Sequence, residues 1–263
     1  MSTNEKKTLA ALLGNNIKIW IVELISGMIE KEREVLCMPL PNKELAFERT
    51  SAKQRVYETV KDWIIEGQFK PGEKVSDVEI ADYFKVSRTP VREALQLLES
   101  QKLVKSYPGK ATIVTELETD DIEKWYLPMA MLQQMAITLA VEKITPSHIN
   151  QLKKLSDVFK ECIKEQKKPM PILKADKAFH SCILEAAGNE YITDFCNVLW
   201  IHIQRLEYSF FRDTPLEASV EEHERMIQVL EMKDSYLASV LAKEHWDRTA
   251  LSIRELNKHE WGI

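Results

Sequence analysis

The segment from Ser87 to Leu98 constrains the fold of this chain more than any other. Its apolar residues recur at helical spacing, so they form one face of a helix that must be buried. Pro90 falls in the first turn, where a missing backbone N–H costs little, and Ser87 or Thr89 is expected to cap the helix start. The buried face consists of Val91, Ala94, Leu95 and Leu98.

The N-terminal end of this helix keeps four polar residues on its exposed side. They are Ser87, Arg88, Thr89 and Arg92. A short helix with an apolar back and a basic N-terminal end is typical of the recognition helix of a helix-turn-helix, whose first residues reach base edges in the major groove. We therefore expect these four residues to contact DNA.

The flanking sequence predicts the rest of a winged helix-turn-helix over residues 51–115. Ser76 and Glu79 form a capping-box pattern before a short apolar helix, and an earlier amphipathic helix ends at Gly67. Downstream, two β-prone runs at 103–105 and 111–114 are expected to pair as a hairpin, the wing. The wing tip adds two further residues that we expect to contact DNA, Gly109 and Lys110.

The run from Val56 to Val114 resembles the winged helix-turn-helix of GntR-type bacterial regulators. The resemblance rests on Lys70-Pro71-Gly72-Glu73, Ile80-Ala81, the run from Val86 to Leu95, and Pro108-Gly109. It implies a transcription regulator that binds a double-stranded DNA operator. A winged helix used only for protein contacts is the alternative.

Charge and composition restrict where DNA can bind. The chain has a net charge of −5, to which residues 51–115 contribute +2 and residues 116–263 contribute −7. DNA contacts should therefore be confined to the first of these segments. The longest apolar stretch, residues 17–29, is interrupted by Lys18 and Glu23, so we expect a cytoplasmic protein without a membrane span. The cysteines show no metal or disulfide spacing and are expected to be reduced; they are Cys37, Cys162, Cys182 and Cys196.

Residues 1–50 precede the predicted DNA-binding domain, and residues 1–37 allow two interpretations. They could form an amphipathic helix against another surface. Alternatively, the codons for residues 31–35 can spell a purine-rich ribosome-binding site, in which case Met38 is the native start and residues 1–37 are not part of the native protein.

Helical periodicity without any strand pattern fills the chain after a polar linker at residues 116–121. We predict a mostly α fold, in which the winged helix-turn-helix is followed by an antiparallel all-α bundle at 122–263. Asp120 and Glu123 should start its first helix. The predicted helices are 122–141, 148–165, 172–187, 191–211, 217–232 and 235–259.

Four residues of this bundle could bind one metal ion. Asp176 and His180 lie four residues apart and so on one face of a helix. His223 and His245 are each flanked by apolar residues at helical spacing, which directs both imidazoles into the bundle. One carboxylate with three imidazoles suits zinc, nickel or manganese. From spacing alone, a surface pair or hydrogen-bonded core histidines explain the same pattern better than coordination does.

The region from Asp120 to His259 resembles the FCD effector domain found in the FadR branch of GntR regulators. The residues that carry the resemblance are Asp176-Lys177-Ala178-Phe179-His180, Glu222-His223 and His245. It implies a divalent metal held by Asp176, His180, His223 and His245, a small carboxylate effector, and a homodimer. One departure is that Met129 and Gln133 stand where such domains often carry an arginine and a glutamate.

Further polar residues of the bundle lie outside this set of four. Arg205 is a candidate for holding an anionic effector, whereas His202, His148 and His259 are expected to be exposed to solvent. The main hypothesis is a metabolite-responsive transcription regulator that is not an enzyme. Two alternatives remain: a metal-dependent enzyme that uses the same Asp/His site, and a regulator without metal whose bundle serves only for dimerisation.

Overall fold

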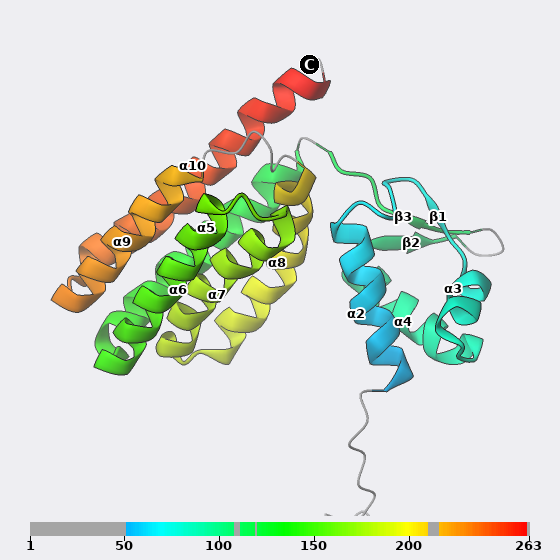
Figure 1. Ribbon diagram of the computed structural model, residues 1–263, viewed down its shortest axis with the longest axis horizontal. Coiled ribbons are helices and arrows are strands. Elements are labelled where there is room, and N and C mark those ends of the chain that lie inside the picture. Colours follow the sequence, from blue (N-terminus) through cyan, green and yellow to red (C-terminus); the bar gives the residue numbers. More distant parts are fainter. Residues whose placement is uncertain (1–50, 108–110, 119, 210–215, 262–263) are drawn as a thin grey trace, which may run out of the picture. The chain divides into compact units, whose positions relative to one another are not determined.

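The computed structural model describes residues 51–107, 111–118, 120–209 and 216–261, with side chains up to Leu256. The alternative start at Met38, the wing residues Gly109 and Lys110, and the side chain of His259 lie outside the described residues. The expected fold class is confirmed: a helix-turn-helix with a small antiparallel sheet precedes an all-α bundle (Figure 1).

Three helices and three short strands make the first part of the described chain. They are α2 (Ala52–Ile65), β1 (Lys74–Val75), α3 (Asp77–Phe84), α4 (Arg88–Ser100), β2 (Val104–Ser106) and β3 (Thr112–Val114). The predicted hairpin of β2 and β3 is confirmed, with Val104 opposite Val114. β1, a strand that the sequence did not predict, pairs with the other side of β3. Two residues are too few to show a strand periodicity.

The apolar face predicted for α4 is buried. Val91, Ala94 and Leu98 have no exposed surface, and they pack with Val60 of α2 and Ile80 of α3. The turn between α3 and α4 is tight because Lys85 adopts a left-handed conformation with φ 55°. This core fixes the N-terminal end of α4 at the surface.

Two predicted caps differ from the structure. Ser87 occupies the N-cap position of α4, but its side chain makes no capping hydrogen bond. Ser76 accepts from the Glu79 backbone N–H at 3.3 Å, but the structure shows no return bond from the Glu79 side chain among residues 51–107. The capping-box prediction is therefore half correct.

Six helices form the described bundle, as predicted. They are α5 (Asp121–Lys143), α6 (Pro146–Lys164), α7 (Pro169–Ala187), α8 (Glu190–Ser209), α9 (Glu217–Met232) and α10 (Ser235–Trp261). Pro146 and Pro169 each begin a helix, where proline is tolerated. Asp120 occupies the N-cap position of α5, but its side chain makes no capping hydrogen bond. The neighbouring Asp121 carboxylate accepts from the Glu118 N–H.

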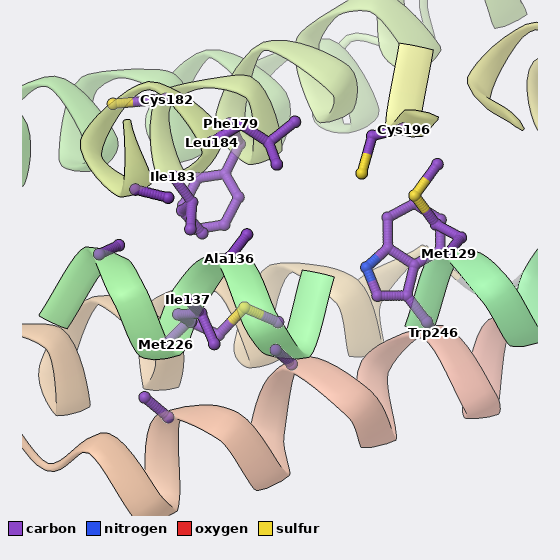
Figure 2. Packing of buried hydrophobic residues seen from close by; sticks show 14 of the residues in the cluster. Met129, Ala136, Ile137, Phe179, Cys182, Ile183, Leu184, Cys196, Met226 and Trp246 are labelled. Carbon is purple, nitrogen blue, oxygen red and sulfur yellow. The ribbon is translucent and has the colours of Figure 1, made fainter. Parts of the chain in front are cut away.

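The core of the bundle is built around α5, which packs against α7, α8 and α10. Its alanines 130, 136 and 140 are fully buried, and such small side chains leave room for large ones from neighbouring helices. Phe179 of α7 and Trp246 of α10 pack into the same cluster as Ala136 (Figure 2). Burying each side chain of this size contributes about 1.5 to 3 kcal/mol. Polar groups placed inside such a core must find partners there.

Candidate metal centre and nucleic-acid interface

The exposed N-terminal end of α4 presents the four residues expected to contact DNA. Ser87 and Thr89 are exposed, and the side chains of Arg88 and Arg92 are 51% and 61% exposed. Both arginines bind Asp77 of α3. Arg88 Nη2 lies 2.9 Å from Oδ2 and 3.1 Å from Oδ1, and Arg92 Nε lies 2.7 Å from Oδ2.

Hydrogen bonding to Arg92, followed by that to Arg88, holds the pKa of Asp77 below its usual range. Asp77 is therefore ionised at neutral pH and pairs with two cations. The sequence did not single it out, because it lies eleven and fifteen residues away from its partners.

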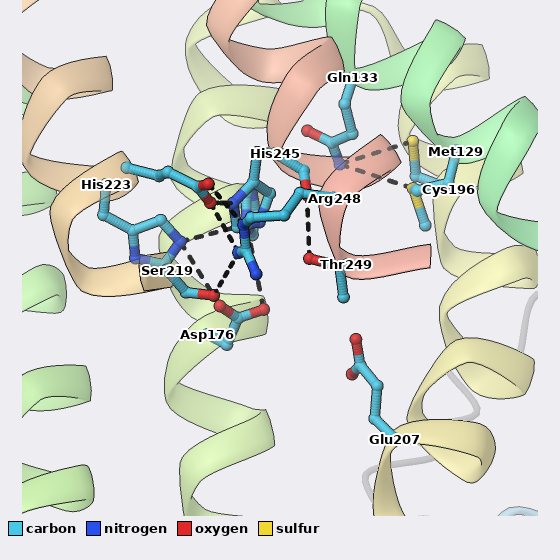
Figure 3. A network of polar contacts seen from close by, with 12 residues as sticks. Met129, Gln133, Asp176, Cys196, Glu207, Ser219, His223, His245, Arg248 and Thr249 are labelled. Carbon is cyan, nitrogen blue, oxygen red and sulfur yellow. Dashed lines mark hydrogen bonds and ion pairs between the residues drawn. The ribbon is translucent and has the colours of Figure 1, made fainter. Parts of the chain in front are cut away.

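The structure brings Asp176, His180, His223 and His245 together inside the bundle. Each residue offers one ligand atom, and these atoms all lie within 4.8 Å of one another. His180 Nε2 lies 3.2 Å from His245 Nε2 and 3.3 Å from His223 Nε2. The Asp176 carboxylate reaches His223 Nε2 at 3.4 Å. Figure 3 shows Asp176 of α7, His223 of α9 and His245 of α10 converging.

Packing holds the imidazoles in place. The three histidines are at most 3% exposed. The ring of Phe179 stacks on His223 with a centroid distance of 3.8 Å, and Trp246 lies against His180 at 5.1 Å. His223 Nδ1 is buried and has no hydrogen-bond partner among the described residues. The ring is therefore held by stacking and by the contacts of its Nε2 atom with His180 and Asp176.

A carboxylate behind the cluster orients His245. Glu222 Oε2 accepts from His245 Nδ1 at 2.6 Å, and Glu222 also binds Arg248 Nη2 at 2.7 Å. Because the Glu222 carboxylate engages Nδ1, Nε2 is the ring nitrogen of His245 that faces the cluster. Arg248 is fixed in turn by Ser219 Oγ at 2.9 Å.

Burial sets the protonation states of the cluster. Burial, followed by the charge of His245, lowers the pKa of His180 and of His223 well below the usual value, so both rings are neutral at pH 7. Burial raises the pKa of Asp176 to about 6. Burial would also raise the pKa of Glu222, but hydrogen bonds from His245 and Arg248 outweigh it and lower this pKa to about 2.

The geometry of the cluster fits a metal ion. Two nitrogens bound to one zinc at roughly 2.0 to 2.1 Å with tetrahedral angles lie roughly 3.3 Å apart, close to the spacing of the histidine Nε2 atoms. The neutral rings of His180 and His223 and an ionised Asp176 carboxylate are also in the protonation states that coordination requires. The residues present therefore suit a divalent transition metal.

The cluster opens onto a cavity that is lined by both charged and apolar side chains. Asp176, His245 and Arg248 line it together with Glu207 of α8 and Trp246. The remaining walls are Phe159, Ile172, Leu173, Leu216, Ser219 and Thr249. The indole N–H of Trp246 is buried and has no hydrogen-bond partner among the described residues. A buried donor without a partner is costly unless a bound molecule supplies an acceptor.

Glu207 occupies another part of the same cavity. Figure 3 shows its carboxyl group apart from the histidine cluster and pointing toward Thr249. Tyr126 donates a hydrogen bond to Glu207 Oε1 at 3.0 Å. Burial, followed by the charge of Asp176, raises the pKa of Glu207 to about 8, so this carboxyl group is neutral at pH 7.

Of two expectations about polar residues of α8, the exposure of His202 is wrong, and the effector contact of Arg205 has no support from the lining of the cavity. Arg205 is 2% exposed and does not line the cavity; it donates to the backbone oxygen of Thr115 at 2.6 Å and to its hydroxyl at 3.1 Å. His202 is 6% exposed and stacks on Trp125 with a centroid distance of 4.8 Å. Helical spacing could not distinguish a polar side chain directed into an interface from one directed into the cavity or into solvent.

The structure also shows the surroundings of two further polar residues, His148 and Gln133. His148, expected to be solvated, is half-buried and completes a capping box with Thr145 at the start of α6. Gln133 is buried, and its amide nitrogen lies 3.8 Å from the Met129 sulfur and 3.9 Å from the Cys196 sulfur. Neither Met129 nor Gln133 lines the cavity. Arg248 is the basic side chain among the residues that line it.

Sequence reasoning missed Glu222, Arg248 and Glu207 as parts of the site. Arg248 follows His245 by three residues, a spacing that places both on one face of α10, so this signal was available. Glu207 gave no such signal.

Cys162, Cys182 and Cys196 are free and buried, as expected. None of the described helices is long and apolar enough to cross a membrane.

Comparisons with known proteins agree with this architecture. The family described as bacterial regulatory proteins, gntR family, matches residues 52–114, and the FCD domain matches residues 127–248. The chain is 30% identical over 182 residues to the HTH-type transcriptional regulator LutR of Bacillus subtilis, covering 61% of this chain and 82% of LutR. It is 25% identical over 193 residues to the regulator YdhC of the same species, covering 73% of this chain and 86% of YdhC.

A solved structure supports the fold. Escherichia coli McbR/YncC superposes with a TM-score of 0.69 at 21% identity, covering 80% of this chain and all of that one. Both family matches fall on the two parts that the structure resolves, the helix-turn-helix and the bundle. The chain therefore belongs to the GntR family of bacterial transcription regulators and carries an FCD domain after its helix-turn-helix.

Proposed function

We propose that this regulator binds operator DNA as a homodimer and that a small carboxylate effector, bound at a divalent metal in the FCD domain, modulates that binding. The observation that carries the proposal is the convergence of Asp176, His180, His223 and His245 beside a cavity that Arg248 also lines. DNA binding is assigned to Ser87, Arg88, Thr89 and Arg92 of α4 and to Gly109 and Lys110 of the wing. The domain boundaries at 51–115, 116–121 and 122–263 stay predictions.

The four residues of the cluster would hold zinc, nickel or manganese. A bound divalent ion supplies a Lewis acid that attracts a carboxylate oxygen. The chain itself supplies the other recognition elements. Arg248 is fixed by Glu222 and Ser219 at the cavity wall, and Trp246 offers an unused N–H. Apolar walls exclude water and strengthen these polar contacts.

The proposal is tested in two steps. Wild-type protein is first used to enrich sequences from a randomised DNA duplex pool, which yields an operator. Metal-loaded and chelator-treated proteins are then titrated with that operator in the presence of acetate, lactate, citrate and other small acids. We expect at least one acid to change operator affinity only when metal is present. Equal responses with and without metal would contradict the metal-linked effector site, and failure to enrich any sequence would contradict operator binding.

A pH-dependent stability effect is expected from Glu207. Its pKa is about 8 in the folded protein against 4.5 as the ordinary value, so the folded state binds a proton more tightly than the unfolded state. The stability that this proton provides is present below pH 4.5 and is lost as pH rises through about 8. Glu207→Gln is permanently neutral. Its stability relative to wild type should therefore increase between pH 5 and pH 8.5, by an amount on the order of a few kcal/mol.

Urea unfolding at several pH values, with chelator present, measures this difference. Glu221→Gln is a matched control because Glu221 lies on an exposed side of α9 and is 71% exposed. A difference between wild type and Glu207→Gln that does not depend on pH would show that Glu207 is ionised in the folded protein.

Dimerisation is assigned to the exposed side of α5. Leu127, Met131 and Met135 lie one turn apart from each other and are 59%, 45% and 54% exposed. On α8, which packs beside α5, Phe195 and Val198 are also exposed. Exposed apolar side chains in one row are typical of an interface, and a two-fold operator requires a second copy of the recognition helix.

Met131→Glu is therefore expected to convert the dimer into a monomer, because it places a charge within an apolar contact. Analytical ultracentrifugation measures the change. Val158→Glu alters an equally exposed apolar residue on α6 and should leave the dimer intact. If both variants stay dimeric, the contact between copies lies elsewhere.

A further inference from the structure

We propose that Asp77 is a positioning residue for base recognition, which holds Arg88 and Arg92 side by side at the free end of α4 before DNA binds. This inference rests on the proposed binding of operator DNA. It goes further than contact with DNA, because it explains how the two arginines distinguish one DNA sequence from another.

The position of Asp77 is well defined. It is the first residue of α3, directly after the N-cap Ser76, whose hydroxyl accepts a backbone hydrogen bond at 3.3 Å. Its side chain is 23% exposed, whereas both arginine side chains are more than half exposed. A restrained carboxylate thus anchors two long side chains that have few other restraints.

The contacts themselves are geometrically specific. Arg88 binds both oxygens of Asp77, through Nη2 at 2.9 and 3.1 Å and through Nε at 3.3 Å. Arg92 uses Nε at 2.7 Å. The shared carboxylate offsets the repulsion between two guanidinium groups one helical turn apart. It also reduces the rotamer freedom that both side chains would otherwise lose on binding DNA.

The negative charge of Asp77 weakens the part of DNA binding that is independent of sequence. A carboxylate near DNA repels the phosphates, and removing it should increase affinity for any duplex. A positioning role predicts that the same removal decreases affinity for the operator. These opposite signs distinguish positioning from a simple electrostatic contribution.

The test compares Asp77→Ala with Glu79→Ala. Glu79 lies in the same first turn of α3, is exposed, and forms no ion pair among the described residues. Glu79→Ala therefore removes the same charge from the same turn without affecting the arginines. The probes are the duplex that wild-type protein enriches from a randomised pool and a scrambled duplex of equal length and composition.

For Asp77→Ala we expect the ratio of operator to scrambled affinity to fall about tenfold, within the range for loss of a well-placed bidentate arginine contact. Affinity for the scrambled duplex should stay constant or rise. Glu79→Ala should change both affinities by the same factor and leave the ratio unchanged.

Two results would overturn the inference: an unchanged ratio in Asp77→Ala, or increased affinity for both duplexes, which would show that Asp77 only competes with DNA for the arginines. If Asp77→Ala does not fold, as judged by circular dichroism, the isosteric Asp77→Asn replaces it and the same fall in the ratio is expected. A wild-type protein that enriches no sequence contradicts the proposed DNA binding instead, so the two failures can be distinguished.

Discussion

Chelation of a metal-loaded sample is expected to lower the melting temperature of the FCD domain by about 5 to 10 °C. A ligand that binds only the folded state stabilises it by about 2.7 kcal/mol at a concentration one hundred times its dissociation constant. For a domain of this size, each kcal/mol corresponds to a shift of about 2 to 4 °C. His223→Ala should melt lower than loaded wild type, and its melting temperature should no longer respond to metal or chelator.

Elemental analysis and differential scanning calorimetry of wild type and His223→Ala provide the measurement. His148→Ala is a suitable control, because His148 caps α6 and belongs to no metal-ligand group among the described residues. It should keep the full response to metal. If loaded wild type contains no divalent metal and its melting temperature ignores the chelator, the four residues are structural and the site assignment is wrong.

The same cluster predicts a loss of stability in acid. The pKa values of His180 and His223 are depressed in the folded protein, so their neutral forms favour folding above the unfolded value of about 6.5. This stability is lost as pH falls below about 6.5, because the unfolded chain then takes up protons that the folded chain does not. Metal affinity should fall in the same direction, since protons compete for the imidazole nitrogens.

Arg88→Ala is expected to weaken operator binding by about 1 to 3 kcal/mol if the guanidinium makes a bidentate base contact. Lys110→Ala on the wing should behave differently. A phosphate contact there would weaken binding to all sequences alike and reduce the slope of log affinity against log salt by about one. Fluorescence anisotropy with the enriched operator and a scrambled duplex, at several salt concentrations, measures both effects.

Arg254→Ala is a control for the loss of one exposed positive charge, since Arg254 lies on α10 and pairs with exposed Glu123. It should alter neither affinity. If Arg88→Ala and Lys110→Ala both leave operator affinity unchanged, the assignment of α4 and the wing as the DNA-binding surface is wrong.

Local patterns in the sequence determined most of the fold. The apolar faces of α4 and of the bundle helices follow from helical spacing, and the breaks between helices follow from Pro146, Pro169 and Gly188, which act within one turn of chain. The helix caps were less predictable. Ser87 and Asp120 occupy N-cap positions without making capping bonds, so the residue type alone did not decide the cap.

Only the tertiary structure determined which polar side chains meet. Asp176 and His180 are neighbours by helical spacing, but their convergence with His223 and His245 depends on how three helices pack. The link from Asp77 to Arg92, the pairing of Tyr126 with Glu207, and the orientation of Arg205 toward Thr115 join residues 15, 81 and 90 positions apart. Helical periodicity gives the direction of a side chain relative to its own helix. The partner in that direction depends on helix crossings, which are fixed by the shapes of all the buried side chains together.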